Sequence, residues 1–330
     1  MLASRRVVPT CEFHVPISPT PDFFNRIRFL AASLDRYSGL TPGDYRLVVT
    51  VGAAERIDLD RACPWGRQYP IEWRWVPDDV FAAWSMWGTA FVRYTYRFDA
   101  DVVVMLDGDT LVTGSLAQVI ADAAAEDHVA AVPAFYSPFY LHPDLMRVRS
   151  PHDWWRELFA ATGVGEPAFT MEHTAWPMLR WRFPPYKREL RLSPPYVNAG
   201  VVAGGASVMA ALGRDVFEDL AIARSQLGTT LDGQVALTLG LHRQRIPFKP
   251  LSIACNFPNV PAFARIYRAE ASDIRVLHFQ SATEVDRQRD FASREAIEAL
   301  LARGHQGLPL QPLNQVLVTR LADLWQTFVD

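Results

Sequence analysis

Apolar and polar positions along the chain follow strand-like and helix-like periods in alternation. A strand is predicted at 11–17, and the next segment has apolar residues at helical spacing, with Thr20 as the N-cap and Pro21 in the first turn. A second strand is predicted at 45–52, because its nearly continuous apolar run is typical of a parallel strand buried on both faces. Residues 78–98 fit a single helix.

The elements after residue 98 continue this alternation. A third strand, 100–106, leads directly into Asp107 and Asp109. The other predicted elements are a helix at 115–127, an irregular region at 134–195, a strand at 196–205, helices at 207–227 and 232–244, and a strand at 273–281. Alternating strands and helices predict a doubly wound α/β sheet, in which ligands bind beyond the carboxyl ends of the strands. The two aspartates stand at such an end.

The chain from about residue 286 onward is predicted to be helical. Its last segment has one apolar face, formed by Leu317, Leu321, Leu324 and Phe328. Only Arg320 is basic there, which is not typical of a helix on a membrane surface. The face is therefore expected to pack either on the core or on a second subunit, and the second case predicts a homodimer through this helix.

Composition restricts the class of protein. A chain of 330 residues with 49% hydrophobic residues can bury a large core, so a folded, soluble protein is expected. Its 33 basic and 36 acidic residues give a net charge of -3, which argues against a nucleic-acid partner. The three cysteines are far apart, the N-terminus has no apolar segment of a secretory signal, and the uncharged stretch 192–213 contains prolines and glycines. We therefore expect a cytoplasmic protein with reduced cysteines and no membrane span.

Asp107 and Asp109 carry the candidate chemistry. Two carboxylates set one residue apart after a buried strand cannot both enter the core, because an unpaired buried charge is strongly unfavourable. Their oxygen atoms suit a hard divalent ion such as Mg²⁺ or Mn²⁺. A solvated turn is the alternative interpretation, since Asp and Gly favour turns.

Four segments together resemble one family. "ADVVVMLDGDTLVTGSL" resembles the Asp-x-Asp segment of the GT-A nucleotide-sugar glycosyltransferases. Three later segments resemble, in the same order, parts of the family 8 retaining enzymes, which include glycogenin and bacterial galactosyltransferases. They are the Asn-Ala-Gly-Val strand "YVNAGVVAGG", the helix start "LDGQVALTLGL" and the strand end "VLHFQS". The resemblance covers about residues 10–285, and it implies a metal-dependent, retaining transferase with a UDP-sugar as the expected donor.

The resemblance implies a GT-A (Rossmann-like) α/β fold, with a mixed, mainly parallel sheet flanked by helices. One glycosyltransferase domain is predicted over residues 1–285, with a nucleotide-binding half at 10–130 and an acceptor half at 131–285. Residues 286–330 are predicted to form a helical C-terminal extension. The expected partners are a nucleotide-sugar donor and an acceptor, which is a saccharide, a lipid or a protein.

The resemblance also implies roles for individual residues. Asp107, Asp109 and His278 are the implied ligands of Mn²⁺ or Mg²⁺, which neutralises charge on the departing nucleoside diphosphate. Donor-binding residues are expected at Ser18, Thr20, Phe23, Arg93, Asp107, Gly108 and Asp109. The implied catalytic residues near the sugar are Asn198, Asp232 and Gln234. Because no well-placed strong nucleophile is evident, attack from the leaving-group side is favoured.

Several of these residues have a structural alternative. Phe23, which would stack on the base, also fits the apolar face of its helix. Arg93 fits a solvated helix position, and His278 fits a hydrogen-bonded strand end. Aromatic residues of the irregular region either contact the acceptor or form a small local core. They are Trp154, Trp155, Trp176, Trp181 and Tyr186.

The sequence departs from the family pattern at two places. Gly233 interrupts the Asp-Gln pair, which leaves the site assignment at this helix start open. After His278, Ser281 replaces a glycine and Glu284 replaces the lysine that relatives use for the diphosphate. Arg287 or Arg289 is the candidate replacement, since guanidinium groups bind phosphate bidentately.

Other classes share parts of the pattern. "LDGDTLV" is similar to the Asp-x-Asp-x-Thr/Val box of haloacid-dehalogenase-like phosphatases, but Leu111 stands at the Thr/Val position. Sugar-nucleotide pyrophosphorylases have a Gly-rich, Arg-containing loop after the first strand, which "VPISPTPDFF" does not resemble. The alternatives to an active glycosyltransferase are a catalytically inactive relative that binds a nucleotide sugar and a Mg²⁺-dependent phosphatase.

Overall fold

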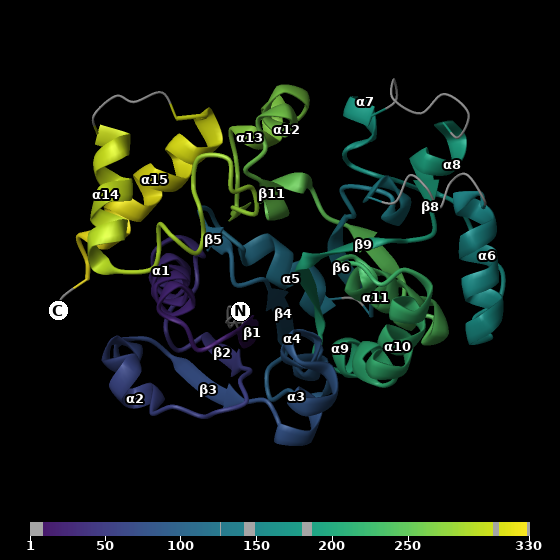
Figure 1. The fold of residues 1–330 in the computed structure, drawn as a ribbon, viewed down its shortest axis with the longest axis horizontal. Coiled ribbons are helices and arrows are strands. Elements are labelled where there is room, and N and C mark those ends of the chain that lie inside the picture. Colours follow the sequence, from purple (N-terminus) through teal and green to yellow (C-terminus); the bar gives the residue numbers. More distant parts are fainter. Residues whose placement is uncertain (1–8, 126, 142–148, 180–186, 306–309, 329–330) are drawn as a thin grey trace, which may run out of the picture.

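A seven-stranded sheet forms the centre of the computed structural model, which describes residues 9–125, 127–141, 149–179, 187–305 and 310–328. The strand order is β10-β6-β9-β4-β1-β2-β3 (Figure 1). Strand β9 runs antiparallel to both of its neighbours, and every other neighbouring pair is parallel. The predicted mixed, mainly parallel sheet is confirmed.

The strands of this sheet are β1 (Cys11–Ile17), β2 (Tyr45–Val51), β3 (Ile71–Trp75), β4 (Val102–Leu106), β6 (Val129–Pro133), β9 (Val197–Gly205) and β10 (Phe248–Pro250). A second sheet has the order β11-β12-β5 and consists of β11 (Phe257–Pro258), β12 (Val276–His278) and β5 (Thr110–Val112). A short pair is formed by β7 (Met171–Glu172) and β8 (Leu192–Ser193). The strand predicted at 273–281 is shorter in the structure than expected, because only Val276–His278 pairs with β5.

Strand β4 shows why helices cover both faces of the sheet. Its side chains alternate between two hydrophobic cores, with Val102, Val104 and Leu106 in the first and Val103 and Met105 in the second. All five are buried, as the continuous apolar run predicts for a strand covered on both sides.

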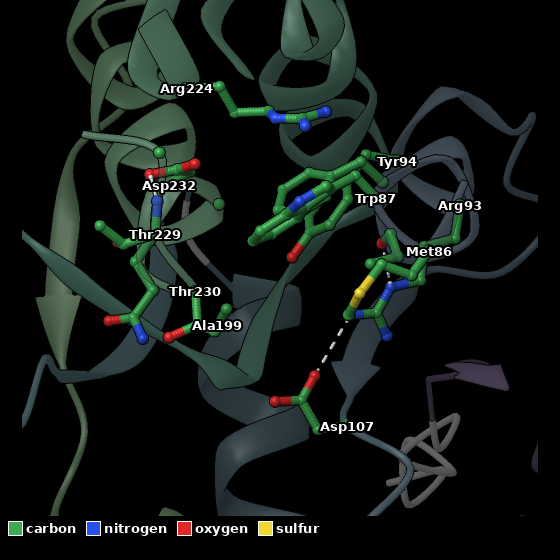
Figure 2. Close-up of a pocket in the computed structure, with 15 residues that line it drawn as sticks. Met86, Trp87, Arg93, Tyr94, Asp107, Ala199, Arg224, Thr229, Thr230 and Asp232 are labelled. Atoms are coloured by element: carbon green, nitrogen blue, oxygen red, sulfur yellow. Dashed lines mark hydrogen bonds and ion pairs between the residues drawn. The ribbon is translucent and has the colours of Figure 1, made fainter. Parts of the chain in front are cut away.

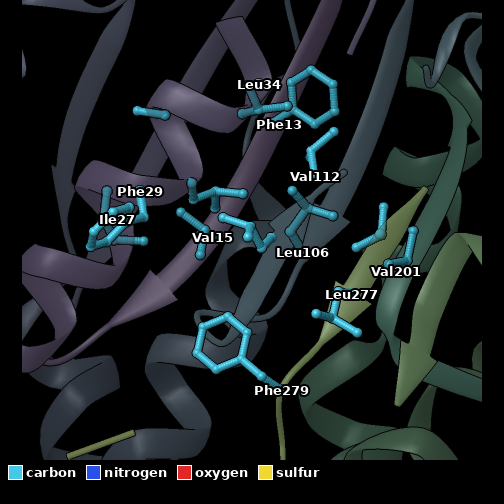
Figure 3. Packing of buried hydrophobic residues seen from close by; sticks show 14 of the residues in the cluster. Phe13, Val15, Ile27, Phe29, Leu34, Leu106, Val112, Val201, Leu277 and Phe279 are labelled. Atoms are coloured by element: carbon cyan, nitrogen blue, oxygen red, sulfur yellow. The ribbon is translucent and has the colours of Figure 1, made fainter. Parts of the chain in front are cut away.

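Helix α1 (Pro21–Tyr37) covers the first core. Its Ile27 and Leu34 pack beside strands β1 and β4 (Figure 3). Thr20 is the N-cap residue, as predicted, but its hydroxyl donates to Asp22 Oδ1 at 2.5 Å and does not cap a backbone amide. The proline at the first helical position removes one amide that would need a cap.

The single helix predicted at 78–98 is wrong. The structure has α3 (Asp78–Trp84) and α4 (Met86–Val92), separated by Ser85, whose φ is 53°. The two helices pack closely, since a Cβ on Gly88 would lie 2.9 Å from a carbonyl oxygen of α3. The apolar spacing fits one helix or two, and the close packing of the two segments selects the break.

The helix predicted at 207–227 is also two helices, α9 (Ala206–Gly213) and α10 (Val216–Gln226). The chain turns where α9 meets another backbone segment. A Cβ on Gly213 would lie 1.9 Å from the Tyr94 carbonyl oxygen, so only glycine allows this approach.

The region 134–195, predicted to be irregular, contains a regular helix, α6 (Pro151–Thr162). The Ser150 hydroxyl accepts from the Asp153 amide at 3.1 Å, and Gly163 ends the helix in the left-handed conformation. Two short helices, α7 (Trp176–Leu179) and α8 (Lys187–Arg191), also lie here.

The remaining helices are α2 (Leu59–Ala62), α5 (Ala117–Ala125), α11 (Asp232–Arg243), α12 (Pro261–Ile266), α13 (Arg268–Ala271), α14 (Arg294–His305) and α15 (Pro312–Trp325). Among the helices of the described ranges, none combines the length and the apolar character needed to cross a membrane.

The C-terminal helix α15 packs on the body of the protein. Its Leu317, Leu321 and Leu324 are buried in the first core, and the helix contacts α1 (Figure 1). The Phe328 ring lies 4.8 Å from that of Phe29. The core interpretation of this apolar face is right. A homodimer through this helix stays a prediction, and it would have to use residues other than these buried leucines. The domain boundary at residue 285 also stays a prediction.

Candidate active site

The turn after β4 holds the two carboxylates in a defined position. The Asp107 amide donates to the Gly200 carbonyl at 3.1 Å, and the Thr110 hydroxyl donates to the Asp107 carbonyl at 2.7 Å. Gly108 has little room for a side chain, because a Cβ there would lie 3.1 Å from a carbonyl oxygen of β1. Asp109 is buried, whereas Asp107 is partly exposed.

Strand β12 places His278 beside this turn. It pairs antiparallel with β5, so that His278 lies opposite Thr110. His278 Nε2 is 3.1 Å from Asp109 Oδ1 and 3.9 Å from Asp107 Oδ2. One ligand atom from each of these three residues lies within 4.8 Å of the others, a spacing at which they could hold a metal ion. We call Asp107, Asp109 and His278 the carboxylate–histidine cluster.

Two asparagines orient His278. The Asn256 carboxamide oxygen lies 3.0 Å from His278 Nδ1, and Asn256 Nδ2 donates to Asn198 Oδ1 at 2.8 Å. Because a carbonyl oxygen only accepts, Nδ1 carries a proton, and Nε2 is left to bind a proton or a metal ion. Asn198 Oδ1 also accepts from the Gly200 amide at 2.9 Å, so Asn198 acts on the histidine through Asn256. Asn256 has no motif around it, and sequence reasoning missed it.

Neighbouring charges shift the pKa values inside the cluster. Burial works against ionisation of Asp109, but His278 and Arg287 hold the pKa of Asp109 well below its usual range. Burial also opposes a charge on His278, yet Asp109 and Asp107 raise the pKa of His278. The two carboxylates therefore favour a positive charge next to them, at the position of the His278 ring.

Two arginines add positive charge. Arg93 is buried, donates to three backbone carbonyls at 2.8, 2.7 and 2.5 Å, and has its Nη2 3.7 Å from Asp107 Oδ1. The interpretation of Arg93 as a solvated helix residue is therefore wrong. Arg287 pairs with Asp109 through Nη1. Of the two candidate replacements for the family's lysine, Arg287 reaches the carboxylates, whereas Arg289 pairs with its neighbour in sequence at 2.8 Å.

Glu284, at the position where the resemblance implies a lysine, has a structural role. Its Oε2 accepts from the Gln311 amide and from Asn314 Nδ2, both at 2.8 Å. These two donors lie at the start of α15. A carboxylate at this position therefore ties the C-terminal helix to the segment that follows β12, which a lysine could not do.

Phe23 lies against the carboxylate turn. Its Cε1 is 3.0 Å from where a Cβ on Gly108 would be. Arg26 Cζ lies 3.8 Å from the centroid of the Phe23 ring, and Arg26 Nη1 donates to the Gly108 carbonyl at 3.3 Å. Arg26 was missed, although it lies one turn after Phe23 on the same helix face. Ser18 and Thr20 are exposed in the loop after β1, and their described contacts do not include Asp107 or Asp109.

A cavity of about 650 Å³ lies beside Asp107 (Figure 2). Arg93, Asp232 and Gln234 line it together with Asp107. The structure thus brings predicted donor-binding and catalytic residues to one cavity. Asn198 is not part of its described lining and instead bonds to Asn256. Asp232 Oδ1 accepts from the Thr229 amide at 2.8 Å, at the start of α11.

The opposite wall of the cavity is aromatic and was missed. Figure 2 shows Trp87 and Tyr94 facing the side that carries Asp232. A Cβ on Gly233 would lie 2.4 Å from Phe91 Cζ and 3.0 Å from Trp87 Cζ3, so only glycine fits between Asp232 and Gln234. Gly233, which interrupts the Asp-Gln pair, is therefore the residue that leaves space for the aromatic side chains of this wall.

The aromatic residues proposed for the acceptor lie elsewhere. Trp154, Trp155 and Trp176 are buried in the second core, which agrees with the interpretation of a local core. Trp181 and Tyr186 lie outside the described residues.

Comparison with known proteins gives no match by sequence, neither to a family model nor to a curated protein. By structure, the chain is similar to the galactosyltransferase LgtC, solved with donor and acceptor sugar analogues, at 15% identity and a TM-score of 0.56 over 97% of this chain and 96% of that one. Mouse xyloside xylosyltransferase 1 is 12% identical, with a TM-score of 0.50 over 84% and 100% of the two chains.

The glycosyltransferase GlyE of Streptococcus pneumoniae TIGR4 is 13% identical, with a TM-score of 0.50 over 97% of this chain and 63% of that one. At such identities the similarity concerns the fold. The chain has the GT-A-like fold of these glycosyltransferases, as the resemblance to family 8 implied.

Proposed function

We propose that this protein is a metal-dependent, retaining glycosyltransferase with a UDP-sugar as its donor. Asp107 carries the proposal, because it belongs both to the carboxylate–histidine cluster and to the lining of the cavity. A diphosphate held at the cluster leaves its sugar at the cavity. The shared fold of LgtC and xyloside xylosyltransferase 1 supports this proposal.

The cluster suits Mn²⁺ or Mg²⁺. Two carboxylates and an imidazole are acceptable ligands for Mn²⁺, and their atoms lie within 4.8 Å of one another. Asp107, Asp109 and His278 would hold the ion, and Asn256 would keep His278 Nε2 turned toward it. When bound, the ion would neutralise negative charge on the departing diphosphate.

Arg287 takes the place of the family's lysine in this proposal. Its side chain is 39% exposed and pairs with Asp109, so it lies near the cluster and remains accessible to a ligand. On donor binding, Arg287 exchanges the carboxylate for a phosphate oxygen, which a guanidinium binds well. Arg93 is held by backbone carbonyls and stays beside Asp107.

Retention is proposed to occur by attack from the leaving-group side. Two carboxylates line the cavity, Asp107 and Asp232. Asp107 is assigned to the metal ion, and Asp232 already accepts a backbone hydrogen bond at 2.8 Å. The acceptor oxygen then bonds to the anomeric carbon as the bond from that carbon to the diphosphate breaks, and the acceptor's proton passes to a diphosphate oxygen.

One experiment tests the proposal against its alternatives. The wild-type chain is incubated with a panel of UDP-sugars, with and without Mn²⁺, and released UDP is measured without acceptor. Slow, Mn²⁺-dependent hydrolysis of one UDP-sugar is expected. Thermal stabilisation without turnover would instead support an inactive binding relative, which the departures at Gly233 and Glu284 favour. Release of inorganic phosphate from sugar phosphates would support a phosphatase.

A further inference from the structure

Tyr94 carries a buried hydroxyl that has no hydrogen-bond partner among the residues the structure describes. The side chain is 1% exposed and lines the cavity beside Asp107. Figure 2 shows it on the cavity wall, with its hydroxyl directed into the cavity. Buried polar groups in proteins are nearly always paired, so an unpaired donor at a cavity wall indicates a ligand that supplies the acceptor.

The phenol ring is held in place before any ligand binds. Phe91 stacks on it with ring centroids 5.8 Å apart and planes inclined by 19°. Gly213 lies against the Tyr94 backbone, where a Cβ would be 1.9 Å from the carbonyl oxygen. Burial raises the pKa of Tyr94 to about 12, so the hydroxyl stays protonated near neutral pH and acts as a donor. A donor fixed in this way discriminates between ligands at little entropic cost.

The position of Tyr94 decides which part of a ligand it meets. Asp107 joins the cavity to the carboxylate–histidine cluster, so the sugar attached to the diphosphate enters the cavity from that end. The exposed residues of the lining are left for the acceptor, and they are Met86, Arg224, Gly228 and Thr230. A buried donor near Asp107 therefore faces the sugar that is transferred.

We propose that Tyr94 is a specificity-determining residue that donates a hydrogen bond to one hydroxyl group of the transferred sugar, an inference that rests on the proposed function. A site that hydrogen-bonds a particular hydroxyl rejects sugars that cannot accept that bond. Tyr94 thus selects among UDP-sugars, while the cluster binds the diphosphate that all of them share.

A matched control comes from Tyr45. Its hydroxyl is also buried and without a partner among the described residues, but Tyr45 does not line the cavity. It lies on β2 in the first core, with its ring 5.9 Å from that of Phe13. Tyr45→Phe removes the same chemical group from a place that no sugar reaches in this proposal.

Calorimetric titration of Tyr94→Phe, Tyr45→Phe and wild type with Mn²⁺ and either UDP or the preferred UDP-sugar tests the inference. We expect UDP to bind all three proteins equally, and the UDP-sugar to bind Tyr94→Phe about tenfold more weakly than the other two. UDP-sugars that each lack one hydroxyl extend the test. One of them should bind wild type and Tyr94→Phe with equal affinity, because the bonded hydroxyl is gone.

The outcomes separate the two proposals. Equal UDP-sugar affinity of Tyr94→Phe and wild type would overturn the role of Tyr94 and leave the proposed function standing. An equal loss of affinity for UDP and UDP-sugar would also overturn it, because the effect would then not concern the sugar. Failure of wild type to bind any UDP-sugar would overturn both proposals.

Discussion

The carboxylate–histidine cluster and the cavity share Asp107 but are built differently. In the cluster, Asp109 and His278 contact each other, and backbone groups and neighbouring side chains hold them in place. Their backbone comes from the ends of strands β4 and β12. In the cavity, α4 and the turn after it supply an aromatic wall with Trp87 and Tyr94, whose hydroxyl lacks a partner among the described residues.

This difference indicates a division of labour. A network in which charges balance one another suits an ion and a diphosphate, whatever sugar is attached. A mostly aromatic wall with one unpaired donor suits the recognition of a particular sugar. Substitutions in the cluster should therefore change the binding of UDP, and substitutions in the cavity should change the binding of the sugar.

The largest effect is expected for Asp109→Asn. The change removes a proposed metal ligand, takes the paired carboxylate from Arg287 and takes the nearer of two carboxylates from His278. We expect Mn²⁺-dependent UDP affinity to fall at least about 100-fold in calorimetric titrations. Asp60→Asn, at an aspartate 71% exposed, is the control. Wild-type UDP affinity in Asp109→Asn would contradict the metal assignment.

Asn256→Ala tests the support of the cluster. The substitution removes the acceptor that orients His278 Nδ1. Loss of such an outer partner should weaken Mn²⁺ affinity roughly 10- to 100-fold, while the ligands themselves stay in place. The measurement is UDP binding over a range of Mn²⁺ concentrations. An unchanged Mn²⁺ requirement would show that the asparagine pair does not position the histidine.

Gly233→Ala tests the cavity. The added Cβ would lie 2.4 Å from Phe91 Cζ, so the aromatic wall must shift, at a cost of about 1–3 kcal/mol in the free energy of unfolding. Sugar-dependent binding should weaken while UDP binding persists. Gly43→Ala is the control, because a Cβ there meets nothing within 4 Å. Denaturant unfolding gives the stability, and equal values for both variants would refute the close contact.

Arg287→Gln sharpens the assignment of the diphosphate cation. We expect UDP affinity with Mn²⁺ to fall about tenfold, since a charge-assisted hydrogen bond is lost, and its salt dependence to weaken. Arg289→Gln serves as the matched control, because Arg289 is 66% exposed and pairs with Asp290. Equal effects of the two substitutions would count against a specific role for Arg287.

The smallest effect concerns His173 and the dependence of folding stability on pH. Burial lowers the pKa of His173 to about 4 from its ordinary value of 6.5. Between these values the unfolded chain binds a proton that the folded chain does not, so stability falls as the pH falls. The loss between about pH 7 and pH 5.5 is about 1 kcal/mol. His173→Gln should flatten this dependence in denaturant unfolding, and an unchanged slope would contradict it.

Local patterns predicted much of the sheet and part of the site. The apolar runs of β1, β2 and β4 identified buried strands, because burial on both faces leaves a direct mark on the sequence. The helix break at Ser85 could not be predicted, since the apolar spacing fits both one helix and two. Likewise, Asn256 carries no local signal of its contact with His278, and the place of Arg26 one turn after Phe23 does not specify its bond to the Gly108 carbonyl.

The sequence alone identified the strands β1, β2, β4 and β9, the placement of Asp107 and Asp109 at a strand end, and the resemblance that implied a role for His278, but it did not indicate β3, β6 or β10. These features depend on the succession of neighbouring residues. Only the tertiary structure decided that Arg287, and not Arg289, reaches Asp109, and that Tyr94 lines the cavity. Such contacts join segments far apart in the chain, and they arise from strand pairing and helix packing that no local pattern records.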